Sequence, residues 1–154
     1  MLDPLQRVIT VPCSQKNAFD IFLTGMDGWW PKAKFTVAAM AGAPAPLIRV
    51  EPRVGGTITE VGADGSEVVW GIITTYDPHG LLAMDFHMPR PGDVVTGRPK
   101  LELRFDPLSP AETRVTLTQS NWEALGDWAV PSQGGYAYAW TPIFETAYAG
   151  ACQV

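Results

Sequence analysis

The side chains with the clearest potential for acid–base chemistry lie at the end of one predicted strand. Asp85 and His87 are separated by a single residue in a segment that is expected to be extended, so they should point to the same side of that strand. A carboxylate beside an imidazole can act as a general acid–base pair. We favour a simpler interpretation, a polar strand end that runs into a Pro-rich loop, because one carboxylate and one histidine form no distinctive motif.

A second polar pair follows Trp122 in the segment SNWEALGDW. Glu123 and Asp127 are four residues apart and could hydrogen-bond the polar end of a ligand, although the solvated face of a short helical turn is the more ordinary explanation. We therefore assign no catalytic residue and keep Asp85, His87 and Glu123 as the candidates that an enzyme would use.

Motifs for metals, phosphates and covalent nucleophiles are missing from the sequence. His79 and His87 are the only histidines, no Cys/His cluster has the spacing of metal ligands, and there is no P-loop, GxGxxG or GxSxG motif. Cys13 and Cys152 lie near opposite ends of the chain, and we interpret them as buried or idle thiols in a reducing cytoplasm. No metal and no cofactor are expected.

Composition places the chain among folded globular proteins. Hydrophobic residues make up 46% and charged residues 18% of the sequence, which argues against disorder, and the length fits one domain over residues 1–154. The net charge of −5 and the scattered basic residues argue against nucleic-acid binding. No apolar stretch is long enough to span a membrane and the first residues do not resemble a secretory signal, so we expect a cytoplasmic protein.

Strand patterns dominate the middle of the chain and predict an α+β fold with about seven antiparallel strands. Leu101 and Leu103 alternate with charged residues, and residues 112–119 alternate in the same way, which is typical of a sheet with one buried face. Two short helices are predicted after the first strand, residues 5–11, and Ser14 is the expected N-cap of the first helix.

The last predicted element is an amphipathic helix of about 17 residues that begins at Ser132. We expect Pro142 to kink this helix, because proline removes a backbone donor and crowds the preceding turn. The helix should pack on the inner face of the sheet. Its apolar stripe consists of Tyr136, Trp140, Ile143, Phe144 and Ala147.

Large apolar side chains predict an apolar cavity between the sheet and this helix, since ligand sites need concave apolar walls with few oriented polar groups. For each ring, simple filling of the core is the competing explanation. Trp29-Trp30-Pro31 and the small-residue loop 38–46 form either a pocket rim with a movable cover or a staple for the first helices. The predicted ligand-binding residues are Trp29, Phe35, Trp70, Met84, Phe86, Trp122, Tyr136, Trp140 and Phe144.

Four segments occur in a familiar order: AFDIFLTGMDGWWP (18–31), EPRVGGTITEVGADGSEVVWGIITTYDPHGLLAMDF (51–86), TRVTLTQSNWEALGDWA (113–129) and GYAYAWTPIF (135–144). Together they resemble the START/SRPBCC superfamily, in the branch related to the C-terminal domain of the heat-shock-protein-90 ATPase activator. The resemblance implies a helix-grip (START/Bet v 1-like) fold, in which a curved sheet grips the long last helix around a pocket. Such pockets hold lipids, hormones or polyketides, so the fold alone does not fix the function.

Three functions follow as hypotheses. The first is non-catalytic binding of a small hydrophobic or amphipathic ligand, and the second is a polyketide-cyclase/aromatase-like enzyme that uses the same cavity. The third is a chaperone-associated interaction module, although the cochaperone's separate N-terminal domain has no counterpart in this chain. The expected partner is a small hydrophobic ligand. A homodimer and a chaperone contact stay open, and neither nucleic acid nor a membrane span is expected.

Overall fold

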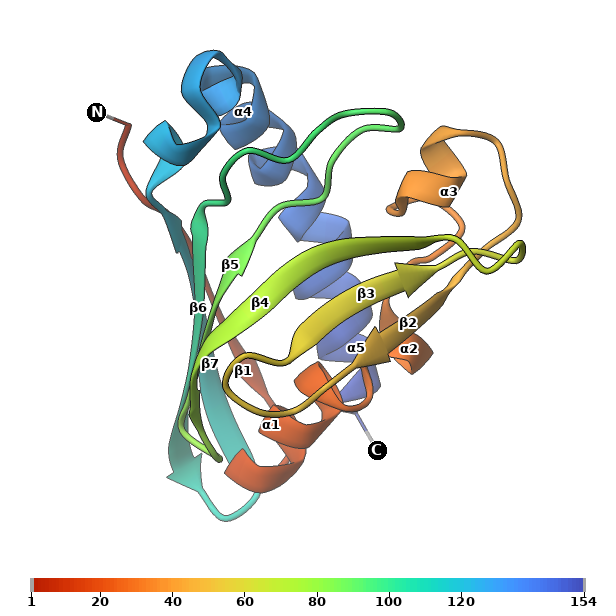
Figure 1. Ribbon diagram of the computed structural model, residues 1–154. Helices are drawn as coiled ribbons and strands as arrows, with labels where there is room; N and C mark the ends of the chain where they lie inside the picture. Colours follow the sequence, from red (N-terminus) through yellow and green to blue (C-terminus); the bar gives the residue numbers. More distant parts are fainter. Residues whose placement is uncertain (1, 154) are drawn as a thin grey trace.

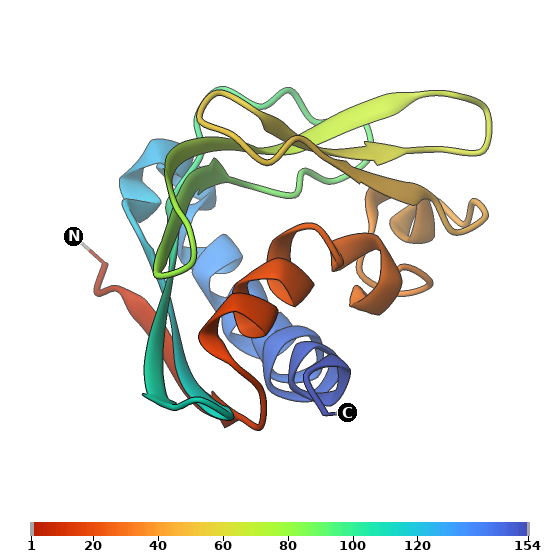
Figure 2. The ribbon, with the colours of Figure 1, turned by 90° about the horizontal axis from the view of Figure 1, so that it is seen from below.

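The computed structural model describes residues 2–153 and contains one seven-stranded antiparallel sheet in the order β1-β7-β6-β5-β4-β3-β2 (Figure 1). The sheet curves around α1 and the C-terminal helix, which lie together on its concave side (Figure 2). This arrangement confirms the predicted α+β helix-grip fold. The strands are β1 (Leu5–Val11), β2 (Leu47–Val50), β3 (Thr57–Val61), β4 (Glu67–Asp77), β5 (Leu81–Phe86), β6 (Lys100–Ser109) and β7 (Glu112–Ser120).

Three short helices follow β1, one more than predicted. They are α1 (Gln15–Leu23), α2 (Met26–Trp29) and α3 (Val37–Met40). The first begins as predicted, because Ser14 Oγ accepts the backbone N–H of Asn17 at 3.1 Å. The single turn of α3 overlaps the start of the predicted loop 38–46, and Thr36 caps it by accepting the N–H of Ala39 at 3.0 Å.

The C-terminal helix begins earlier than predicted and is continuous to Ala151. It consists of α4 (Ala129–Trp140), a π-helical segment η2 (Thr141–Tyr148) and α5 (Ala149–Ala151), preceded by a 3₁₀ segment η1 (Trp122–Trp128). The predicted start at Ser132 was wrong, since Pro131 fits within the first turn, where backbone N–H groups have no partner inside the helix. Pro142, which cannot donate a backbone hydrogen bond, lies where the α-helical pattern changes to the π-helical one.

The predicted stripe of the C-terminal helix faces the concave side of the sheet. Trp140, Ile143 and Phe144 are buried there, and Tyr136 and Ala147 pack against the same core. Trp140 also donates from Nε1 to the side-chain oxygen of Gln119 on β7 at 2.9 Å. The helix is therefore held on the sheet by apolar burial and by a buried hydrogen bond.

A buried carboxylate on β3 fixes the position of α3. Glu60 is 3% exposed and accepts the backbone N–H groups of Val37 at 2.8 Å and Ala38 at 2.7 Å. Its Oε1 also lies 3.1 Å from Nε1 of Trp70, which donates to it. Met40 of α3 lines the cleft described below. By holding α3, Glu60 therefore also helps to position one wall of that cleft.

At the other side of the sheet, Arg7 joins the edge strand β1 to the C-terminal helix. Its guanidinium donates to the carbonyl oxygen of Ala137 at 2.8 Å, and its Nε lies 3.0 Å from Oε1 of Glu145. Arg7 points to the concave face of the sheet, like Leu5 and Ile9 on the same strand. These polar contacts connect the first strand to the last helix in addition to apolar packing.

Cys13 and Cys152 are both buried, as predicted. Burial raises the pKa of both thiols, and that of Cys152 rises to about 12. Since the thiolate is the reactive species, we expect a dithionitrobenzoate reagent at about pH 8 to label neither cysteine of the folded protein and both cysteines after denaturation. Rapid release of the coloured thiol from native protein would contradict this prediction.

Candidate ligand-binding cleft

An open cleft of about 490 Å³ lies at one end of the sheet. Its walls come from the loop between β5 and β6, from η1, from α4 and from α3, four segments that meet at the top of the view in Figure 1. Most of the lining is apolar. The larger apolar side chains in it are Met40, Met88, Val94, Val95, Leu125 and Trp128.

A hydrogen-bonded pair, His87 and Tyr136, supplies polar groups to the wall of the cleft. The hydroxyl of Tyr136 accepts the N–H of Met88 at 2.9 Å and lies 3.1 Å from Nδ1 of His87. Because the N–H of Met88 can only donate, the hydroxyl proton is free to be donated to Nδ1. The neutral imidazole then carries its own proton on Nε2, where it can be donated to a ligand.

The surroundings keep His87 neutral. Burial, with a further contribution from the positive charge of Arg98, lowers the pKa of the imidazole, and the carboxylate of Asp93 opposes this shift. Burial also raises the pKa of Tyr136, so the phenol keeps its proton. The pair therefore presents hydrogen-bonding groups to the cleft without a net charge of its own.

Arg90 lies across the mouth of the cleft, from the β5–β6 loop to η1. Its Cζ is 4.0 Å from the centre of the Trp128 ring, and its Nε lies 3.0 Å from a carboxylate oxygen of Asp93. Trp128 is 54% exposed, whereas the other five tryptophans are buried. A stacked guanidinium on a half-exposed ring thus connects the two sides of the opening.

A protein-family model with the description "Activator of Hsp90 ATPase homolog 1-like protein" matches residues 22–146. The chain belongs to this family. The match confirms the resemblance inferred from the sequence and accounts for the helix-grip architecture. No curated protein matches the chain.

Solved structures show the same fold at low sequence identity. The anthrahydroquino-γ-pyrone synthase Txn09, in complex with SUM, is 24% identical, with 97% of each chain covered and a TM-score of 0.63. The self-sacrificing resistance protein CalC from Micromonospora echinospora is 20% identical, with 97% of this chain and 91% of CalC covered and a TM-score of 0.64. The Aha1 dimer from Colwellia psychrerythraea is 15% identical, with coverage of 89% and 90% and a TM-score of 0.55.

In this member of the Hsp90-activator-like family, most of the predicted ligand-binding residues are buried in the protein and do not line the cleft. Tyr136 lines it, but the other eight predicted residues are not among its lining. Seven of those eight are buried, six of them within the core on the concave side and Trp122 outside that core cluster, and Phe35 packs against the core while partly exposed. A ligand role for these eight stays a prediction. The seven buried residues are Trp29, Trp70, Met84, Phe86, Trp122, Trp140 and Phe144.

The predicted acid–base candidates are not brought together. His87 lines the cleft, whereas Asp85 and Glu123 are exposed and outside its lining. Asp127 is exposed as well, in agreement with the solvated turn considered above. Among residues 2–153, no group of three or more His, Cys, Asp or Glu side chains is arranged to hold a metal ion.

The Trp29-Trp30 corner anchors backbone rather than forming a rim. Trp29 donates from Nε1 to the carbonyl oxygen of Ile21 at 2.8 Å, and Trp30 donates to that of Phe35 at 2.7 Å. Of the loop 38–46, Met40 lines the cleft. Apart from His87, sequence reasoning missed the lining residues of the β5–β6 loop and also those of η1 and α4 other than Tyr136. In the loop, the adjacent apolar Val94 and Val95 inside a Pro/Gly-rich segment were the available signal.

Within the described part of the chain, none of the helices combines the length and the apolar character needed to cross a membrane.

Proposed function

We propose that the protein binds a small, largely apolar molecule in the cleft between the β5–β6 loop, η1 and α4. The observation that carries the proposal is the cleft itself, whose volume of about 490 Å³ lies within the range of small-molecule sites. Its apolar walls would remove the body of a ligand from water, and burial of apolar surface supplies most of the affinity of such complexes.

The few polar groups of the cleft would orient the ligand. In the tautomer in which Tyr136 donates to Nδ1, His87 offers a proton on Nε2 to a ligand. A ligand oxygen that accepts this proton would be fixed at the wall formed by the β5 end and α4. Binding rather than turnover is the function that this arrangement supports best, since the alternative enzyme would depend on His87 without Asp85 or Glu123. A contact with a chaperone and a homodimer stay predictions.

The neutral dye N-phenyl-naphthylamine tests this proposal, because its emission rises when it enters an apolar site. Gly135 lines the cleft and a Cβ atom there would meet no atom within 4 Å, so Gly135→Phe should place a ring in the cleft without a clash. We expect wild type to bind the dye with a micromolar dissociation constant and Gly135→Phe to weaken binding by about tenfold or more.

Gly134→Phe is the matched control. Gly134 is the preceding residue of α4, is exposed, has the same open space around its Cβ position and is not part of the cleft lining. This variant should bind the dye like wild type. Failure of wild type to bind the dye, or equal losses in the two variants, would refute binding in this cleft.

A further inference from the structure

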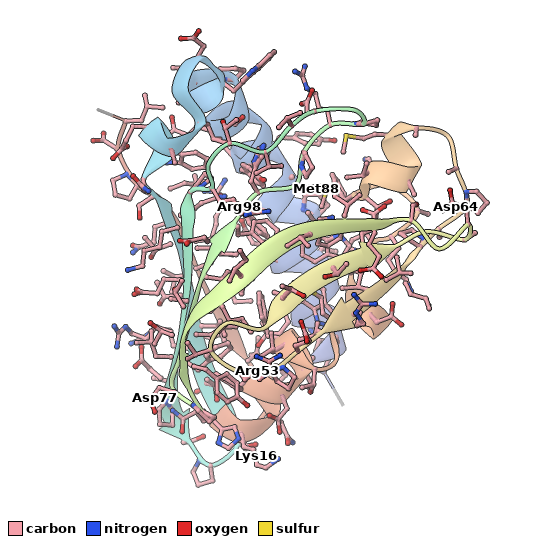
Figure 3. All side chains as sticks on the ribbon, in the orientation of Figure 1. Lys16, Arg53, Asp64, Asp77, Met88 and Arg98 are labelled. Atoms are coloured by element: carbon pink, nitrogen blue, oxygen red, sulfur yellow. The ribbon has the colours of Figure 1, made fainter. Side chains whose placement is uncertain are left out.

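Arg98 lies next to the cleft without being one of its lining residues, and no acidic side chain of residues 2–153 forms an ion pair with it. It follows Gly97, which lines the cleft and lies so close to η1 that a Cβ atom on it would be 2.4 Å from the carbonyl oxygen of Ala124. Figure 3 labels Arg98 and Met88 on the two arms of the β5–β6 connection, next to α4. The backbone just before Arg98 therefore lies against η1, one wall of the cleft.

The side chain of Arg98 is partly buried and its hydrogen bonding is incomplete. Its Nε atom is inaccessible to solvent and has no hydrogen-bond partner among the described residues. No carboxylate oxygen of residues 2–153 lies within 4 Å of its guanidinium nitrogens. A partly buried cation with an unpaired donor is costly in free energy, and a bound anion that accepts from the guanidinium would offset that cost.

The other arginines do not share this environment. Four of them form ion pairs with acidic side chains, and two are exposed on the outer face of the sheet. The paired arginines are Arg7, Arg49, Arg53 and Arg90, and the exposed ones are Arg104 and Arg114.

Charge is therefore unbalanced at the cleft in a protein whose net charge is −5. Arg90 and Asp93 neutralise each other at the mouth, which leaves the positive charge of Arg98 uncompensated. That charge acts on His87, since it contributes to the lowered pKa of the imidazole. His87 itself lines the cleft, and the tautomer that accepts from Tyr136 on Nδ1 carries its proton on Nε2.

We propose that the ligand is an anionic amphiphile, with an oxyanion head group such as a carboxylate or sulfonate on an apolar body, and that Arg98 and the Nε2–H of His87 bind the head group. The inference rests on the proposed function and adds the chemical class of the ligand. The planar guanidinium pairs strongly with two oxygens of such a head group, and the apolar wall formed by Met88, Val95 and Leu125 would cover the body.

Anilinonaphthalene sulfonate and N-phenyl-naphthylamine share one apolar body and differ by the sulfonate, so they separate the two proposals. We expect the sulfonate to bind wild type more tightly than the neutral dye, and Arg98→Gln to weaken sulfonate binding by about tenfold or more while leaving the neutral dye unchanged. Arg98→Lys keeps the positive charge but loses the planar pair of guanidinium donors, so its affinity for the sulfonate should lie between those of wild type and Arg98→Gln. Gly135→Phe should block both dyes, which shows that the sulfonate occupies the cleft.

Arg104→Gln is the matched control, because it removes the same charge from an exposed position on β6 and should leave both dyes unaffected. Binding of neither dye to wild type would refute the proposed function. Binding of both dyes with equal affinity, or an unchanged affinity of Arg98→Gln for the sulfonate, would refute the proposed anionic head group and leave the proposed binding function standing. If Arg98→Gln fails to fold, the wild-type comparison and Arg98→Lys decide the question in the same way.

Discussion

Replacement of Trp140 by alanine is expected to lower the free energy of unfolding by about 3–5 kcal/mol. Trp140 is 1% exposed, and its ring packs against the rings of Trp30, Phe86 and Tyr136 with centroid distances of 6.3, 6.2 and 5.9 Å. The truncation would leave a large cavity between helix and sheet. It would also leave the buried oxygen of Gln119 without its donor, on a side chain whose amide nitrogen already lacks a partner.

Urea unfolding monitored by circular dichroism measures this loss, and Trp128→Ala provides the control. Trp128 is the half-exposed tryptophan, so its removal forfeits the stack with Arg90 and little buried area, and we expect a loss below about 1 kcal/mol. Similar losses for the two variants would mean that the concave side of the sheet is not packed as the structure shows.

Glu60→Ala should also destabilise the fold strongly, by about 3–5 kcal/mol, because hydrogen bonds to a buried carboxylate are strong and its donors would be left unsatisfied. The donors are the N–H groups of Val37 and Ala38 and the indole of Trp70. We further expect the amide protons of Val37 and Ala38 to exchange faster with solvent, because α3 loses its attachment to β3.

Glu67→Ala is the comparison for this effect. Glu67 is on the neighbouring strand β4 and pairs with Arg49, but both side chains are about half exposed, so this ion pair should contribute little to stability. The same urea titration and a hydrogen-exchange measurement check both variants. Unchanged exchange at Val37 and Ala38 in Glu60→Ala would show that the carboxylate does not hold α3.

Periodicity in the sequence was sufficient to predict the sheet and the face of the C-terminal helix. The alternation of Leu101 and Leu103 with charged residues survives folding, because β6 has one face in the core and one in solvent. Helix boundaries were less predictable. Ser132 is a good N-cap residue, but Ala129 to Pro131 extend the helix because Pro131 costs nothing in a first turn.

The location of the cleft could not be predicted from the same patterns. Aromatic residues such as Trp70 and Phe86 predicted a cavity beneath the helix, yet their rings contact one another and fill that space. The cleft forms instead where a loop without periodicity lies against η1 and α4, and no local pattern fixes the path of such a loop. Glu60 is a similar case, because Ile58, Thr59 and Glu60 are all buried and the usual alternation is lost in β3.

The contacts of Arg7 also bear on how copies of this protein can meet. An outer strand with free backbone groups is a template for pairing with another chain, and an inward-pointing charge or a short strand blocks such growth. β1 carries the inward guanidinium held by Ala137 and Glu145, and the opposite border of the sheet, β2, is four residues long and carries Arg49. Both borders are therefore protected against continuous cross-chain sheets, so the protein should resist amyloid-type stacking.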